Sequence, residues 1–135
     1  MLNRSDILLR NLGNNYDPLL DACEKDLTEM SVLLIENGAE IDAKDNSQLW
    51  TPLMHAITNN NEIIILKLLE KGCSLDTVDE DGNTPCHMAV LNENEYILKH
   101  LLNHNAPKNL VNNENMTPLD MAKFNEDEIC IRLLS

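Results

Sequence analysis

The stretch TPCHMAVLNENEYILKHLL, residues 84–102, recurs with small changes on both sides of itself. TPLMHAITNNNEIIILKLL begins at Thr51 and TPLDMAKFNEDEICIRLL begins at Thr117, so the three copies start 33 residues apart. One further step back, of 34 residues, reaches a degenerate copy, DPLLDAC, at Asp17. The chain therefore repeats one structural unit, with a period typical of repeat proteins.

Each copy is predicted to form two short helices. Thr or Asp followed by Pro starts a helix, because the side-chain oxygen accepts from free backbone N–H groups and proline suits the first helical position. The second helix carries an apolar stripe at i, i+1, i+4 and i+5 and ends at Gly38, Gly72 or Asn105, which tolerate a left-handed helix end. The stripe residues are Met30, Ser31, Leu34 and Ile35, then Ile64, Ile65, Leu68 and Leu69, then Ile97, Leu98, Leu101 and Leu102.

A helix pair of this size cannot bury its own apolar face, whereas stacked pairs build a continuous core from local contacts. Turn-rich links such as CSLDTVDEDGN, residues 73–83, return the chain to the next Thr-Pro. The sequence therefore predicts an all-α array of helix-turn-helix units.

The copies resemble the ankyrin repeat, whose signature is Thr-Pro-Leu-His-x-Ala at a period of 33, then a Leu-Leu pair and Gly-Ala-Asp-Val-Asn. TPCHMA at 84–89 matches it, and GAEIDAKD at 38–45 is close to the family hairpin. The resemblance implies an ankyrin-repeat solenoid of helix-turn-helix units linked by β-hairpin fingers. We expect a capping segment over residues 1–16, with its helix at 5–12, and repeats at 17–50, 51–83, 84–116 and 117–135.

A second, looser resemblance concerns the first copy and the end of the chain after one Ile-rich helix. These features are similar to the ankyrin block of multidomain GTPase-activating proteins for ADP-ribosylation factors. The catalytic zinc finger of that class does not occur in the sequence. This resemblance implies an alternative function, a regulatory segment of a larger enzyme.

The charge balance restricts the partners. Ten basic residues face 23 acidic ones, a formal net charge of -13. Nucleic acid and anionic membranes repel such a surface, whereas basic protein surfaces are attracted to it. The start of the chain lacks the pattern of a signal peptide, and no apolar run is long enough to span a bilayer. We expect an intracellular, cytoplasmic monomer that binds no nucleic acid and inserts in no membrane.

Residues that could carry chemistry are explained by structural roles. The cysteines lack C-x-x-C spacing and occupy core positions of the repeat. His100 and His104 lie four residues apart without an evident third metal ligand, and His87 holds the position that bonds near the Thr cap. We therefore predict no enzyme, no metal and no cofactor. The cysteines are Cys23, Cys73, Cys86 and Cys130.

The ankyrin resemblance also implies a concave groove lined by fingers and first helices. In that register the last two repeats present an apolar, Met-rich end and the second finger presents an acidic rim. We predict a scaffold that binds a basic, partly apolar segment of another protein there. Two alternatives are that the Trp covers its own hairpin and that the Met, Leu and Phe side chains pack between first helices. The predicted contact residues are Trp50, His55, Asp79, Glu80, Asp81, Asn83, Met88, Leu91, Met116, Met121 and Phe124.

Overall fold

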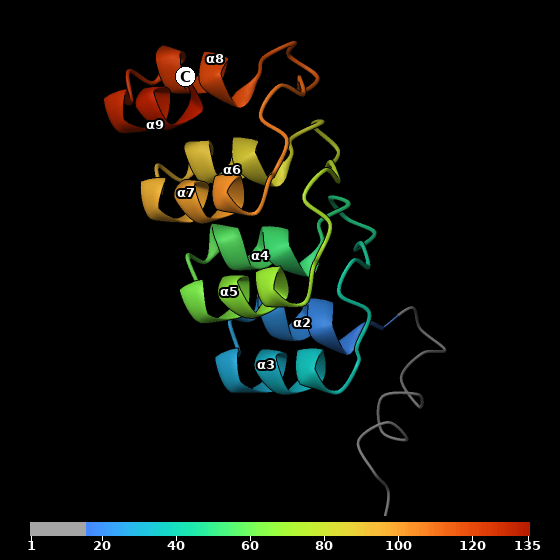
Figure 1. The fold of residues 1–135 in the computed structure, drawn as a ribbon. Coiled ribbons are helices and arrows are strands. Elements are labelled where there is room, and N and C mark those ends of the chain that lie inside the picture. The colour runs from blue at the N-terminus through green and yellow to red at the C-terminus, as the bar shows by residue number, and fades with distance from the viewer. Residues whose placement is uncertain (1–15) are drawn as a thin grey trace, which may run out of the picture.

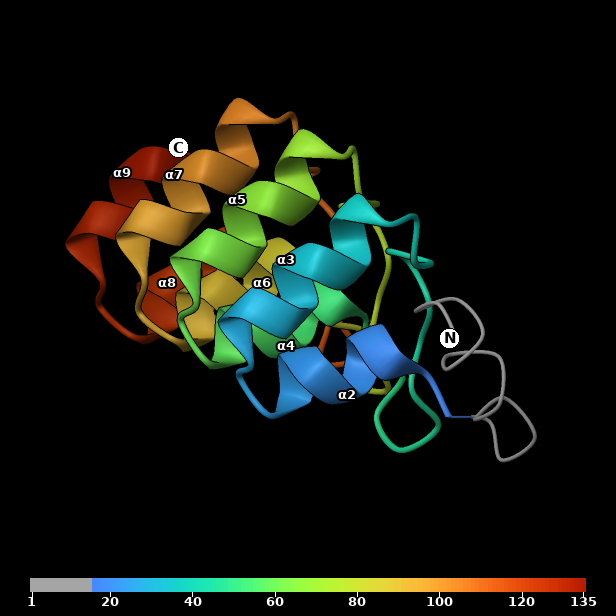
Figure 2. The same ribbon diagram turned by 90° about the horizontal axis from the view of Figure 1, so that it is seen from below.

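The computed structural model describes residues 16–135, so the capping helix predicted at 5–12 lies outside the described residues. The described chain forms eight helices and no strand, which confirms the all-α solenoid. First helices lie in one layer and second helices in another, and the links between units project to one side as fingers (Figures 1 and 2). The pairs are α2 (Pro18–Glu24) with α3 (Thr28–Glu36), α4 (Pro52–Thr58) with α5 (Glu62–Glu70), α6 (Pro85–Leu91) with α7 (Glu95–Asn103), and α8 (Pro118–Phe124) with α9 (Glu128–Leu134).

The predicted helix starts are confirmed. Asp17 accepts from the N–H groups of Leu19 and Leu20, both at 3.0 Å, and Thr51, Thr84 and Thr117 cap the other first helices. Proline follows each cap at the first helical position. These local signals set the register of every unit before any packing is considered.

The apolar stripes of the second helices supply the core. Ile64, Ile65 and Leu68 are completely buried. Each first helix packs against the next one, and α3 packs on α5 as α7 does on α9. Met30 departs from the predicted stripe with 46% of its surface exposed, because α3 has a described second-helix neighbour on one side only. Leu102 is half-buried.

Asparagines connect the turns between helices to the preceding unit. The Asn61 Nδ2 donates to Asp26 Oδ1 and the Asn94 Nδ2 to Asn60 Oδ1, both at 2.8 Å. The Asn92 Nδ2 donates across units to the Ile57 carbonyl at 2.7 Å. Each amide therefore satisfies a polar group of its neighbour while it caps or turns its own chain.

The fingers are turns rather than paired strands, although they were predicted as β-hairpins. Each tip is closed by a backbone hydrogen bond across its base, such as Asp79 N–H to the Asn83 carbonyl at 3.1 Å. Neighbouring tips are joined by Glu80 N–H to the Gln48 carbonyl at 3.0 Å and Asn113 N–H to the Asp81 carbonyl at 2.9 Å. Fingers therefore gain order from the fingers beside them.

The first fingertip stores backbone strain at Leu49. Its φ is +60°, in the position that Gly82 and Asn115 occupy in the other tips. A left-handed conformation costs a residue with a Cβ about 1–2 kcal/mol, whereas glycine costs about 0.5–1 kcal/mol in chain entropy. We therefore expect Leu49→Gly to raise the free energy of unfolding by up to about 1 kcal/mol in urea titrations. Leu49→Ala is the control that keeps the Cβ, and a glycine variant no more stable than the alanine variant would contradict the assignment.

Candidate functional site

The structure divides the predicted contact residues into a buried group and an exposed group. Met88 and Met121 are only 5% and 7% exposed, so the predicted Met-rich surface is wrong. They are buried because consecutive first helices pack directly on one another and enclose the side chains at this position. This outcome matches the alternative of packing between first helices. His55, Asp79 and Asn83 are buried as well.

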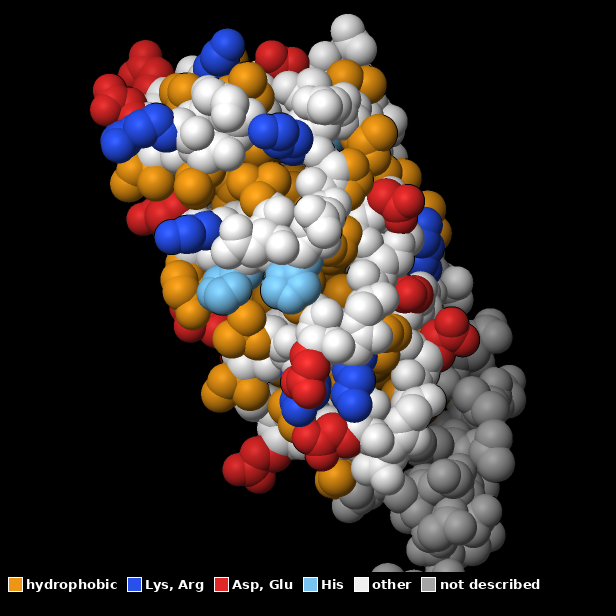
Figure 3. Space-filling model, viewed as in Figure 1, with side chains coloured by type: hydrophobic (Ala, Val, Ile, Leu, Met, Phe, Trp, Pro, Cys, Tyr) orange, Lys and Arg blue, Asp and Glu red, His pale blue; other side chains and the backbone are white. Residues whose placement is uncertain are grey.

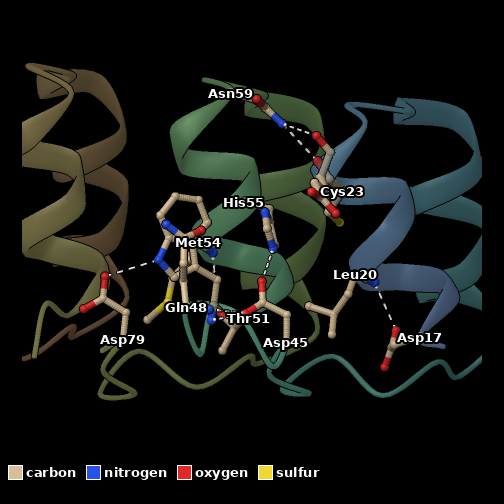
Figure 4. Close-up of polar contacts among 12 residues, drawn as sticks. Asp17, Leu20, Cys23, Asp45, Gln48, Thr51, Met54, His55, Asn59 and Asp79 are labelled. Atoms are coloured by element: carbon tan, nitrogen blue, oxygen red, sulfur yellow. Dashed lines mark hydrogen bonds and ion pairs between the residues drawn. The ribbon is translucent and has the colours of Figure 1, made fainter. Parts of the chain in front are cut away.

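Asp79 holds the second fingertip together and is not a free acidic residue of the rim. One carboxylate oxygen accepts from the N–H groups of Asp81 and Asn83, both at 2.9 Å. The other accepts from the indole N–H of Trp50 at 3.2 Å, so Asp79 connects two fingers (Figure 4). The acidic charge left on this tip belongs to Glu80 and Asp81, which are exposed.

Trp50 lies between the first finger and α4. Its ring meets the His55 ring edge-on with the centroids 5.1 Å apart, and His55 Nε2 lies 2.8 Å from the Asp45 carboxylate (Figure 4). Burial raises the pKa of Asp45, but the N–H groups of Gln48 and Trp50 and the His55 ring lower that pKa by more, so it falls below its usual value. Trp50 is half-buried, and its indole N–H donates to Asp79 of the second finger. It therefore contacts the next finger as well as its own.

His87 joins the start of α6 to the end of the third finger, directly before the fourth repeat begins. Its Nδ1 accepts from the Thr84 N–H at 3.1 Å, and its Nε2 lies 2.8 Å from the Met116 carbonyl. The Nε2 therefore carries the proton of a neutral ring. Burial lowers the pKa of His87, although the Met116 carbonyl and Asp79 favour the charged form. The predicted bond at the Thr cap is confirmed, and the half-buried Met116 is part of the same joint.

The exposed members lie at the ends of the first helices and on the second fingertip. Leu91 is 51% exposed at the end of α6 and Phe124 is 81% exposed at the end of α8. In repeat register they continue a column that begins with Glu24 and Thr58, both exposed. We call these four residues the inner-end column. It changes from acidic and polar in the first two units to apolar in the last two.

The cysteines, the possible metal ligands and the described cavity show no arrangement for chemistry among the described residues. All four cysteines are free and buried, and burial raises the pKa of Cys86 to about 12. Residues 16–135 contain no group of three side chains placed to hold a metal. A cavity of about 390 Å³ between the third finger and α9 has Lys108 as its one ionisable lining residue. Among the helices of this range, none combines the length and apolar character that crossing a membrane requires.

Sequence reasoning missed a second exposed apolar surface. Ile63, Tyr96 and Ile129 lie at the same position of α5, α7 and α9 and are 63%, 46% and 47% exposed. Figure 3 shows hydrophobic side chains along the edge of the second-helix face where these helices begin. The signal was present in the sequence, because the three residues are 33 apart and directly precede the buried stripes.

Comparisons with known proteins give one consistent answer. The family model described as ankyrin repeats (3 copies) matches residues 1–79 and 64–135. Ankyrin repeat protein nuc-2 of Neurospora crassa is 32% identical over 80 residues, which are 59% of this chain and 8% of that protein. The crystal structure of the ankyrin repeat domain of Bcl-3, a unique member of the IkappaB protein family, aligns with a TM-score of 0.78 at 30% identity. That alignment covers 86% of this chain and 50% of the Bcl-3 chain, so the chain spans less than two thirds of either relative.

Proposed function

The chain belongs to the ankyrin-repeat family, and from that membership we propose that it is a non-catalytic module that binds a basic, partly apolar segment of another protein. Ankyrin-repeat domains generally mediate protein–protein interaction. The observation that carries the finer proposal is the exposure of Leu91 and Phe124 in consecutive repeats. Adjacent apolar side chains of this size on a protein surface are typical of binding sites.

The charges around these residues favour a cationic partner. Glu93 and Glu126 lie on the turns that follow Leu91 and Phe124, and both are exposed. One basic residue, Lys123, directly precedes Phe124. The two glutamates outnumber it, so the net charge around Leu91 and Phe124 is acidic. With a net charge of -13, the domain would attract a basic segment over long range and speed its encounter.

The proposed segment carries Leu, Met or Phe for the inner-end column and Lys or Arg for the acidic groups. Neighbouring packed helices lie about 8–10 Å apart, so apolar side chains three residues apart in a polyproline II-like segment, which share one side about 9 Å apart, would reach Leu91 and Phe124. Glu80 and Asp81 are exposed on the second fingertip and offer a second set of acceptors.

The likeness to GTPase-activating proteins stays a prediction, as does the intracellular compartment. A regulatory ankyrin segment would use the same groove, with its partner surface contributed by the enzyme or its target. Sequencing the complete reading frame tests this alternative, since a catalytic zinc finger beside residues 1–135 is what it requires.

A peptide-display selection tests the proposed function. With the isolated domain as bait, we expect enriched peptides to be basic and to contain Leu, Met or Phe. Loss of a binding hot spot costs about 1–2 kcal/mol, so Leu91→Ser combined with Phe124→Ser should weaken the affinity of a selected peptide about tenfold or more in fluorescence anisotropy. Ile63→Ser, which removes an exposed apolar side chain from the second helix α5, is the matched control and should leave the affinity unchanged. Enrichment of acidic peptides, or equal affinity for the double variant, would refute the proposal.

A further inference from the structure

The second-helix face carries an apolar column that the fold does not need. Ile63, Tyr96 and Ile129 occupy one register position on α5, α7 and α9. The stripe that builds the core starts one residue later, with the buried Ile64, Ile97 and Cys130. Exposing a large apolar side chain at the same place in three consecutive units has no benefit for folding. We call these three residues the outer column.

The outer column has an ordered arrangement of charge along the helix direction. An exposed glutamate directly precedes each member. One helical turn further on, toward the fingers, stand Leu66, Lys99 and Arg132, also exposed. Acidic, apolar and mainly basic rows therefore follow one another across this face. The three preceding glutamates are Glu62, Glu95 and Glu128.

Neighbouring charges leave this order intact. The Lys67 ammonium lies 3.2 Å from both Glu36 and Glu70, so its charge is already matched within the domain. The ring of Tyr96 packs edge-on against His100 with the centroids 4.5 Å apart, which holds the central member of the outer column in one orientation. A held aromatic side chain loses little freedom when a partner binds.

The spacing of the column suits a helix that lies across the array. The second helices lie side by side in one layer (Figures 1 and 2). At about 8–10 Å between packed helices, the column is about 20 Å long. An α-helix rises 1.5 Å per residue, so side chains about seven residues apart meet successive members of the column.

We propose that the outer column is a second docking surface, separate from the groove, for an amphipathic helix of a partner protein. That helix carries apolar residues at about every seventh position, Lys or Arg on the flank facing the glutamates, and Glu or Asp on the flank facing Lys99 and Arg132. The charge order fixes both its occupant and its orientation. An anionic membrane is disfavoured because the glutamate row would repel it.

A designed peptide tests the surface directly. The probe is a labelled, end-blocked helical peptide of about 18 residues, which spans about 27 Å, with Leu at every seventh position, Lys on one flank and Glu on the other. In fluorescence anisotropy we expect saturable binding that weakens at least tenfold for Ile63→Ser, Tyr96→Ser and Ile129→Ser combined. The groove variant, Leu91→Ser with Phe124→Ser, should bind this peptide as the unaltered protein does. A failure of the groove proposal would therefore leave this result unaffected.

A second peptide, with its Lys and Glu flanks exchanged along the same apolar row, checks the charge order. It should bind at least tenfold more weakly than the matched peptide. Equal binding of the two peptides, or equal binding by the triple variant, would overturn the proposal. So would concentration-dependent dimerisation lost in the triple variant during sedimentation, or binding to phosphatidylserine vesicles, because the column would then serve a second copy or a lipid surface.

Discussion

Gly82→Ala is expected to lower the free energy of unfolding by about 2–5 kcal/mol. The φ of Gly82 is +76°, where an added Cβ costs about 1–2 kcal/mol through the backbone alone. That Cβ would also lie 2.6 Å from Asn113 Oδ1 and 2.9 Å from the Asn113 backbone nitrogen. Relief of the clash requires the second and third fingers to separate, which would add about 1–3 kcal/mol of strain and lost contacts.

Gly72→Ala provides the matched control for this prediction. Its φ is +77°, almost the same as that of Gly82, but nothing lies within 4 Å of a Cβ built there. We therefore expect it to cost only the backbone term of about 1–2 kcal/mol. Urea titrations followed by circular dichroism would compare the two variants, and equal destabilisation would show that the contact between fingers is not close in solution.

Much of the fold follows from the sequence because its signals are local. A Thr or Asp before Pro places the first helix without reference to the rest of the chain, and the stripe from Ile64 to Leu69 shows which side of α5 is buried. Stacking then requires only that neighbouring units share this register. For the same reason the left-handed residues at Gly72 and Asn105 could be predicted by position.

The exposure of the candidate groove residues could not be predicted in the same way. Met88 follows the groove register but is enclosed by how closely adjacent first helices approach, a distance that no single repeat contains. Asp79 looked like a free acid, whereas its oxygens serve the fingertip and the Trp50 indole. A carboxylate read from sequence as charge can therefore be a buried acceptor in the structure.

The outer column is a different case, since the sequence contained it in plain register. Ile63 and Tyr96 directly precede the stripes that the sequence predicts as buried, so the register already placed them outside the core. The structure adds the extent of the exposure, since Ile63 is 63% exposed whereas Ile64 is completely buried. The asparagines behave similarly, because Asn61 and Asn94 look like ordinary helix caps until their contacts with the preceding unit are seen.

His87→Ala is expected to destabilise the protein by about 3–5 kcal/mol, because it leaves a cavity at a completely buried site and removes the acceptor of the Thr84 N–H. His87→Met places there the residue that Met54 supplies in the second repeat, so it keeps most of the volume and isolates the polar part, about 1–3 kcal/mol. Urea titrations of both variants would show whether the joint to Met116 depends on hydrogen bonding or on volume alone. Equal destabilisation by the two substitutions would contradict a polar role.

The same residue gives the contact between α6 and the third finger a pH dependence with a defined sign. Burial holds the pKa of folded His87 below its usual 6.5, so the unfolded chain binds the proton more readily as the pH falls below about 6.5. The stability that neutral His87 contributes is present above that value and is lost as the pH falls toward the lower folded pKa. Asp45, whose pKa lies below its usual 3.8, acts only in more acidic solution. Between pH 7 and pH 5, the free energy of unfolding should therefore fall more for the unaltered protein than for His87→Met. Equal decreases in the two proteins would mean that the folded ring takes up the proton without breaking its contact with Thr84.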